Sequence, residues 1–275
     1  TPNLPIISEE TSDNKSIENL KNFWLVDPID GTYDYINDLE EFTINAGLII
    51  DKNPVAGLIY APSKKRMFYS YGPDFSFEAD LQAQGFGLVA GVDEVGRGPL
   101  AGPVTAAAVI LDPSNVPAGL NDSKVLSTKK REVLYDLILQ HSSVSVVHVS
   151  VEEIDRINIL QASLLAMRQA ISQLDPGPSF VLIDGNRIPA ELPVPSHAIV
   201  KGDAKSVSIA AASIVAKITR DRLMTDLARQ NPGYGWDKNA GYPTKEHQLA
   251  LQHLGVSPHH RRSFKPVHNI LCGAK

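Results

Sequence analysis

The sequence predicts an α/β protein with a partly parallel sheet, preceded by a smaller α+β piece. From residue 73 onward, apolar runs of strand length alternate with stretches of helical periodicity, the order typical of an α/β layer fold. Upstream, three strand-like runs follow one another with no helix between them. Gly72-Pro73 separates the two patterns, so we expect one part at residues 1–72 and another at residues 73–275.

The upstream part contains an acidic segment and a predicted meander. "WLVDPIDGT" places Asp27 and Asp30 beside proline, glycine and threonine, which predicts a turn able to hold a metal ion and a phosphate. The strand-like runs cover residues 42–50, 55–62 and 66–72, with "DKNP" as a turn between the first two. We expect an antiparallel meander.

The downstream part begins with a short helix within residues 72–87 and continues as mixed strands and helices. Strands are predicted at residues 88–94, 104–112, 143–150, 180–185 and 197–203, and helices at residues 127–141, 152–174 and 206–230. This order predicts a mixed sheet flanked by helices.

The composition is that of a globular protein, with 43% hydrophobic and 21% charged residues. Its single cysteine, Cys272, has no partner for an internal disulfide, and no targeting or membrane segment is visible. We therefore expect a cytoplasmic protein that does not bind membranes.

The net charge of −5 is unevenly distributed. Residues 1–72 carry 11 acidic and 6 basic side chains, whereas residues 73–275 carry 20 of each. The last forty residues are basic on balance, so either a phosphate-binding face or an ordinary solvated surface is compatible with this charge.

Four carboxylates follow the predicted strands. Asp93 and Glu94 end the first strand of the downstream part, Asp184 ends "FVLIDG", and Asp203 ends "HAIVKGD". The carboxyl ends of strands in such sheets share one edge, so we expect the four to meet there. Clustered carboxylates repel unless a cation neutralises them, and oxygen ligands suit Mg²⁺ or Mn²⁺. Two such ions can promote phosphodiester hydrolysis.

Each aspartate taken alone is also explained as a helix cap or turn residue. The conjunction of four carboxylates favours a metal site. "GRGPLAGP" at residues 96–103 is a tight turn that lets backbone groups approach a ligand. "NDSK" offers a lysine and a hydroxyl to a phosphate, and Tyr242 lies among basic residues where its ring can stack on a sugar or base.

Seven separated blocks of the downstream part form a further pattern: "GVDEVGRGPLAGPV", "LNDSK", "INILQASLLAM", "LIDGN", "KGDAKSVSIAAASIVAKITRDR", "GYPTKEH" and "HRRSFKPV". In this order and spacing they resemble the ribonuclease HII family. The resemblance covers residues 73–275 and implies a ribonuclease H-like mixed sheet flanked by helices, with a helical C-terminal extension that closes over the substrate.

The same resemblance implies roles for individual residues. Asp93, Glu94, Asp184 and Asp203 match the metal-binding carboxylates, which hold Mg²⁺ or Mn²⁺, two ions when substrate is bound. Gly96, Arg97 and Gly98 match the turn whose backbone reads the ribose 2'-hydroxyl. Tyr242 matches the tyrosine that packs at the RNA-to-DNA junction, and Ser123 and Lys124 match a phosphate-contacting loop. Val125 departs from the family, which often has a second lysine there.

The implied reaction is hydrolysis of the RNA strand of an RNA/DNA hybrid, including cutting 5' to a single ribonucleotide in duplex DNA. It leaves a 3'-hydroxyl and a 5'-phosphate. The implied partners are these nucleic acids, and we expect a monomer unless the N-terminal part associates.

Residues 1–72 resemble the inositol monophosphatase superfamily, most closely its 3'(2'),5'-bisphosphate nucleotidase branch. Glu9, Asp27 and Asp30 match metal ligands there, with Gly31 and Thr32 at the phosphate. The resemblance stops before the second half of that fold, so we expect a truncated, catalytically silent fragment. "GWDKNAGYP" is similar to a further phosphatase motif, which we interpret as chance because the ribonuclease blocks already account for it.

Two other functions remain open at this point. A metal-dependent phosphatase would release inorganic phosphate from adenosine 3',5'-bisphosphate or an inositol phosphate. A hybrid-binding module without catalysis is disfavoured, because four carboxylates facing phosphates would only weaken binding.

Overall fold

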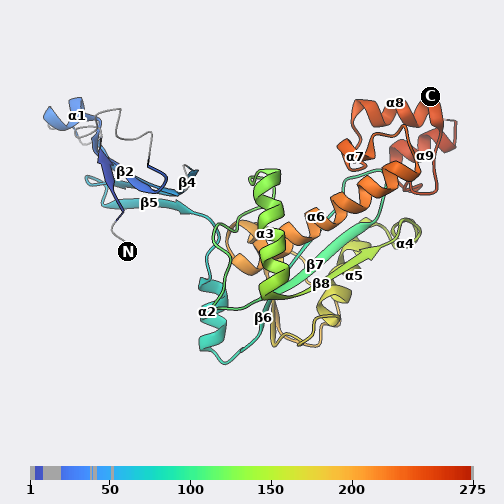
Figure 1. The fold of residues 1–275 in the computed structure, drawn as a ribbon, viewed down its shortest axis with the longest axis horizontal. Helices are drawn as coiled ribbons and strands as arrows, with labels where there is room; N and C mark the ends of the chain where they lie inside the picture. Colours follow the sequence, from blue (N-terminus) through green and yellow to red (C-terminus); the bar gives the residue numbers. More distant parts are fainter. Residues whose placement is uncertain (1–3, 9–19, 38, 40–41, 51–52, 274–275) are drawn as a thin grey trace. The chain divides into compact units, whose positions relative to one another are not determined.

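The structure is a computed structural model in which residues 4–8, 20–37, 39, 42–50 and 53–273 are described. The chain divides into two compact units, Thr1–Gly72 and Pro73–Lys275 (Figure 1). Among the described residues, no helix is both long enough and apolar enough to cross a bilayer.

The described residues of the first unit form a five-stranded sheet and a short helix. Its elements are β1 (Ile6–Ser8), β2 (Phe23–Asp30), α1 (Thr32–Ile36), β3 (Thr43–Ile50), β4 (Asn53–Ala61) and β5 (Arg66–Tyr71). The strand order is β1-β2-β3-β4-β5. Strands β2 to β5 form the expected antiparallel meander, and β1 pairs with β2 in parallel.

The predicted turn at Asp27 is wrong, because both Asp27 and Asp30 lie within strand β2. The pairing with β3 shifts register between these two residues, where Pro28 lacks the N–H that a regular ladder uses. The chain turns at Gly31, whose φ of 92° favours glycine, and α1 begins at Thr32.

The second unit is built on a mixed five-stranded sheet of order β10-β9-β6-β7-β8. Its strands are β6 (Val89–Val95), β7 (Val104–Leu111), β8 (Ser142–Val149), β9 (Phe180–Asp184) and β10 (Ser196–Ile199). Strand β6 pairs with β9 in parallel and with β7 in antiparallel orientation. The predicted mixed sheet is therefore confirmed.

Helices cover both faces of this sheet (Figure 1). The helices described in this unit are α2 (Ser76–Ala83), α3 (Thr128–His141), α4 (Val151–Ile157), α5 (Ile159–Ser172), the 3-10 helix η1 (Gly202–Ala204), α6 (Val207–Gln230), α7 (Trp236–Asn239), α8 (Lys245–Leu254) and α9 (Lys265–Leu271). Those on the two faces include α5 on one side and α3 and α6 on the other. Alternate residues of β7 belong to opposite faces, as the pleat requires. Ala106 and Ala108 pack in the core cluster that contains α5, and Ala107 packs in the cluster that contains α6.

One long helix was predicted at residues 152–174, but the structure has two helices. Asn158 separates α4 from α5 with a φ of 68°, which a continuous helix cannot contain. Its side-chain oxygen accepts hydrogen bonds from the amides of Leu160 and Gln161, so it caps α5. The short predicted helix near residue 76 is present as α2.

The start of α6 is fixed by a buried acid on α2. Glu78 is 1% exposed, and one of its carboxylate oxygens accepts hydrogen bonds from the hydroxyls of Ser206 and Ser208 and from the Ser208 amide. A carboxylate at a helix N-terminus is stabilising. From this end α6 runs to the C-terminal helices, which gather at its other end (Figure 1).

Candidate active site

Two parallel strands bring the predicted acidic residues to one edge of the sheet. Val92 of β6 pairs with Ile183 of β9, so the residues that follow, Asp93 and Asp184, reach the same edge. The Gly202 amide donates to Asp184 Oδ1 over 2.7 Å, which holds η1 and its Asp203 beside the strands. Asp203 therefore belongs to a 3-10 turn after β10 and not to the strand end that the sequence predicted.

Asp93 lies at the centre of this group and is 7% exposed. Burial raises the pKa of Asp93 well above its usual range, and the negative charges of Glu94, Asp184 and Asp203 raise it further. The Glu94 amide donates to Asp93 Oδ1 over 2.7 Å, which fixes the side chain. A compensating positive charge would therefore favour the ionised form of Asp93.

Basic side chains partly supply that charge. Arg97 Nη1 lies 3.2 Å from Glu94 Oε1, and Lys124 Nζ lies 3.8 Å from Asp203 Oδ2. Burial nevertheless raises the pKa of Glu94 and that of Asp203. Within the part of the chain that the structure describes, no three His, Cys, Asp or Glu side chains converge closely enough to hold a metal ion. The acids are neighbours, but their oxygens are turned toward these cations and toward backbone amides.

The donor set fits a hard divalent cation. All four groups are carboxylates, which are the ligands that Mg²⁺ and Mn²⁺ prefer. The pKa of Asp93 is raised because the site is buried and also contains several negative charges, a combination that is common at functional sites. A divalent cation would relieve this excess once Glu94 and Asp203 turn away from Arg97 and Lys124.

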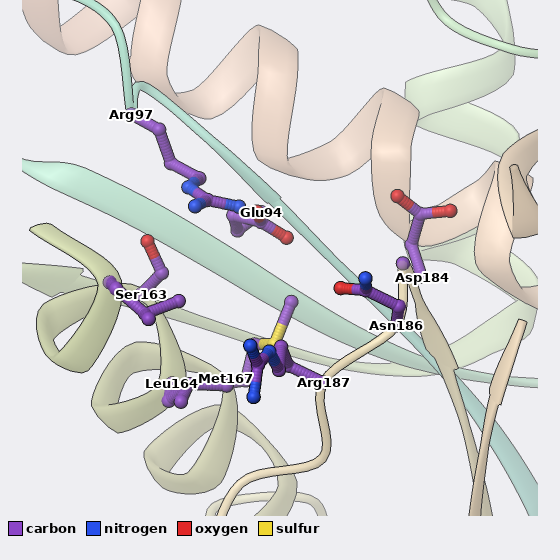
Figure 2. Close-up of a pocket in the computed structure, with 10 residues that line it drawn as sticks. Glu94, Arg97, Ser163, Leu164, Met167, Asp184, Asn186 and Arg187 are labelled. Atoms are coloured by element: carbon purple, nitrogen blue, oxygen red, sulfur yellow. Dashed lines mark hydrogen bonds and ion pairs between the residues drawn. The ribbon is translucent and has the colours of Figure 1, made fainter. Parts of the chain in front are cut away.

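A pocket opens beside Glu94 and Asp184 (Figure 2). Figure 2 shows the Arg97 side chain reaching toward Glu94, with Asp184 and Asn186 at the other side of the pocket. Its remaining lining comes from α5 and from the segment after β9, and comprises Leu160, Ser163, Leu164, Met167, Gly185 and Arg187. Asn186 and Arg187 were not singled out from the sequence, although "LIDGN" contains the first of them.

The glycine-rich turn after β6 lies against the turn that carries Tyr242. Gly96 has a φ of 94°, and a methyl group added at Gly98 would come within 3.4 Å of the Tyr242 ring. The Leu100 amide donates to the Gly241 carbonyl over 2.7 Å. Tyr242 itself is 41% exposed. The structure therefore joins two predicted binding elements that are about 140 residues apart in sequence.

The predicted phosphate loop offers one of its two side chains to solvent. Lys124 is 80% exposed at its side chain and lies near Asp122 and Asp203. Ser123 is buried, and its hydroxyl hydrogen-bonds with that of Ser213 over 2.8 Å. Lys124 is thus the group that can reach a ligand, and Ser123 anchors the loop to α6.

Two buried arginines beside this site were missed by sequence reasoning. Arg220 and Arg261 are both fully buried, and neither has a carboxylate partner among the described residues. Burial lowers the pKa of Arg220 to about 10 and that of Arg261 to about 9, so both remain charged at neutral pH. Arg261 lies in the quoted block "HRRSF", but no periodicity or spacing indicates what a buried arginine contacts.

The acidic residues of the first unit are arranged differently. Asp27 Oδ1 accepts a hydrogen bond from the Ile29 amide, and Asp30 Oδ2 accepts one from the Asn45 side chain. Glu9, the third predicted ligand, lies outside the described residues.

Comparison with known proteins identifies relatives of both parts. The sequence model of the ribonuclease HII family matches residues 90–267. Ribonuclease HII of Ruegeria pomeroyi is 66% identical over 199 residues, which is 72% of this chain and 85% of that protein. Ribonuclease HII of Paracoccus denitrificans is 61% identical over 200 residues, covering 73% of this chain and 95% of that protein.

Solved structures show the same fold. Ribonuclease H2 from Pyrococcus horikoshii OT3 superposes with a TM-score of 0.58 at 28% identity, covering 66% of this chain and 96% of its own. Bst-RNase HIII in complex with Mn²⁺ superposes with a TM-score of 0.55 at 18% identity, covering 92% and 99%. At its N-terminus, residues 1–83 match the model of the inositol monophosphatase family. That match extends past the first unit into α2.

Proposed function

The chain belongs to the ribonuclease HII family and is a metal-dependent endoribonuclease, and from this premise we propose a specific site and substrate for it. The RNA strand of an RNA/DNA hybrid is the substrate, as is duplex DNA that contains a single ribonucleotide. Cutting takes place on the 5' side of the ribonucleotide and leaves a 3'-hydroxyl and a 5'-phosphate.

One observation carries this proposal: a buried carboxylate crowded by three others at the edge of a ribonuclease H-like sheet. Asp93 has its pKa raised by burial and by these neighbours. Stability alone does not favour such an arrangement, because like charges repel in a poorly solvated site. A phosphodiesterase that works through divalent cations needs it.

Asp93, Glu94, Asp184 and Asp203 would hold the cations, which we propose are two Mg²⁺ or Mn²⁺ ions when substrate is bound. Divalent cations there supply Lewis acidity for activating water and for neutralising charge on the scissile phosphate. Of the chain's own groups, Arg97 and Lys124 are the cations that now face Glu94 and Asp203. We propose that both side chains turn toward substrate phosphates on binding. The divalent cations would then neutralise the carboxylates, and the phosphates would become the negatively charged partners of Arg97 and Lys124.

Selection of the ribonucleotide falls to the turn of residues 96–98 and to Tyr242. Backbone amides can donate to a 2'-hydroxyl, which DNA lacks. The Tyr242 ring, partly exposed beside Gly98, can pack on the adjoining nucleotide. This pair of contacts would place the neighbouring phosphodiester beside the four carboxylates.

Residues 1–72 are proposed to be a catalytically silent remnant of an inositol monophosphatase-like fold. The family match ends at residue 83, and the described carboxylates Asp27 and Asp30 are held by local hydrogen bonds. We also propose that residues 73–275 act as a monomer in the cytoplasm, which gel filtration and cell fractionation would test.

The proposed function is tested by incubating a labelled DNA duplex carrying one ribonucleotide with the whole chain and with a version that starts at Pro73. Both should cut 5' to the ribonucleotide in Mg²⁺ or Mn²⁺ and should leave an all-DNA duplex intact. Failure of both to cut would refute the nuclease proposal. Cutting by the whole chain alone would show that residues 1–72 contribute to the site.

The phosphatase alternative has its own readout. Release of inorganic phosphate from adenosine 3',5'-bisphosphate by the whole chain, absent from the shorter version, would show that the N-terminal unit is active. We expect no release.

A further inference from the structure

The two buried arginines lie directly behind the ribose-reading turn and bind its carbonyl groups. Arg261 donates to the carbonyls of Gly96 over 2.6 Å, Arg97 over 3.1 Å and Gly102 over 3.0 Å. Arg220 donates to the carbonyls of Pro103, Ala101 and Ala240 over 3.0, 3.1 and 2.9 Å. Five of these six acceptors therefore belong to the turn of residues 96–103.

Holding two unpaired guanidinium groups in the interior is expensive. A buried charge without a counter-ion loses its hydration, and backbone carbonyls compensate for only part of that loss. The lowered pKa values of both arginines reflect the same penalty. The six hydrogen bonds to carbonyls offset part of this cost and, at the same time, fix the shape of the turn that carries five of the acceptors.

The direction of the bound carbonyls sets the direction of the neighbouring amides. In a trans peptide, the C=O and the N–H of one plane point in opposite directions. The Gly96 carbonyl shares its plane with the Arg97 amide, and the Arg97 carbonyl shares its plane with the Gly98 amide. Because Arg261 draws both carbonyls inward, both amides point away from it. Neither amide has a protein acceptor among the described residues.

The second arginine connects this turn to Tyr242. Arg220 contacts residues 101 and 103 on one side and Ala240 on the other. A methyl group added at Gly96 would come within 2.3 Å of Arg220 Nε, so the side chain fits closely against the turn. The Phe264 ring lies 5.1 Å from the Arg261 guanidinium and supports it from another side.

We infer that Arg261 is a positioning residue for ribonucleotide discrimination, which aims the Arg97 and Gly98 amides at the 2'-hydroxyl while Arg220 keeps Tyr242 in register with them. This inference rests on the proposed function, because it explains how the proposed ribose-reading turn keeps its shape. Arg261 acts through the backbone and does not contact the substrate.

The test compares binding of two labelled duplexes by the full chain and its variants. The duplexes share one sequence, and one carries a single ribonucleotide where the other is all DNA. Binding is measured in Ca²⁺, with a gel check that nothing is cut, and cutting is then measured in Mg²⁺. Arg261→Lys keeps the charge but cannot reach three carbonyls at once. Arg262→Lys, at the exposed neighbouring arginine, is the matched control.

In Arg261→Lys, we expect the preference for the ribonucleotide duplex to fall roughly tenfold, the equivalent of about one net hydrogen bond. Affinity for the all-DNA duplex should stay within about twofold, since phosphate contacts dominate it. The control should keep the wild-type preference. A merely structural arginine would instead weaken both affinities equally, and that result, like an unchanged preference, overturns the inference.

A second variant covers the case in which Arg261→Lys does not fold. Phe264→Leu leaves every donor of Arg261 in place but loosens its support, so the preference should fall by roughly two- to threefold. An unchanged preference in this variant overturns the inference. If the wild-type chain neither prefers the ribonucleotide duplex nor cuts it, the proposed function itself has failed. This outcome is seen in the wild-type chain, so it is distinct from any result that concerns the variants alone.

Discussion

Replacing Asp93 with asparagine should separate the stability of the second unit from its activity. The substitution keeps the shape and the oxygen that accepts from the Glu94 amide, but removes the charge that three carboxylates oppose. We expect it to abolish metal-dependent cutting. We also expect Asp93→Asn to be more stable than the wild-type chain when divalent ions are removed, because a like-charge cluster loses a buried negative charge.

The direction of this gain follows from the raised pKa of Asp93, because burial and three neighbouring negative charges disfavour its charged form. Single substitutions usually change stability by about 1–3 kcal/mol, and we expect a gain in that range at pH 8, or about 2–4 °C in Tm for each kcal/mol in a unit of this size. The folded state binds this proton more tightly, so wild-type stability falls as pH rises through the raised pKa. The advantage of the variant should therefore be smaller at pH 5 than at pH 8.

The assay is thermal unfolding, monitored by circular dichroism, first in EDTA and then in Mn²⁺, at both pH values. Mn²⁺ should stabilise the wild-type chain, because an ion that binds only the folded state shifts the equilibrium toward it. It should stabilise Asp93→Asn much less. Asp80→Asn removes an exposed acid on α2 and serves as the control. A variant that is less stable than wild type in EDTA at pH 8, or that responds equally to Mn²⁺, would refute the reasoning.

Three further predictions concern packing, pH and stacking. Gly91→Ala should lower the free energy of unfolding by about 3 kcal/mol in urea titrations. The added methyl group would lie 2.1 Å from the carbonyl carbon of Ser208, in the backbone of α6. Gly177→Ala is the control and should be neutral, because the space around Gly177 is open. Burial lowers the pKa of His260 to about 4, so the unfolded chain takes up a proton at a higher pH than the folded chain does. The free energy of unfolding should therefore fall by up to about 3 kcal/mol between pH 7.5 and pH 4. His253→Gln, at an exposed histidine, is the control and should keep the same pH profile. A flat profile would contradict this. Tyr242→Ala should lower kcat/KM on the single-ribonucleotide duplex by roughly tenfold to a hundredfold and Tyr242→Phe far less, since stacking needs only the ring; equal losses would argue for the hydroxyl instead.

Much of the second unit was readable from its sequence because its signals are local. Apolar runs marked the strands of the mixed sheet, and alanine-rich periodicity marked α6. The break at Asn158 was not readable, since it depends on one residue with positive φ that also caps the next helix. Asp203 was expected at a strand end, whereas β10 stops at Ile199 and a 3-10 turn intervenes.

The candidate site was readable only as a set of residue types. The sequence indicated which acids belong together, but not that Glu94 and Asp203 would face Arg97 and Lys124. Long-range contacts to backbone carbonyls leave no pattern in a sequence, which is why Arg220 and Arg261 went unnoticed. In the first unit, local composition was misleading: a segment rich in turn residues continues a strand through Asp27 and Asp30.

Helix α6 gives the enzyme a fixed internal length scale. Its 24 residues span about 36 Å, beginning next to Asp203 and Glu78 and carrying Arg220 about 20 Å further along. The distance between the acidic edge and Arg220, which contacts Ala240, is thus fixed by the number of residues in this one helix. Inserting a single residue between them would rotate Arg220 by about 100° around the axis and advance it by about 1.5 Å. The spacing along this helix, and not only the identity of the residues at its two ends, is part of the catalytic design.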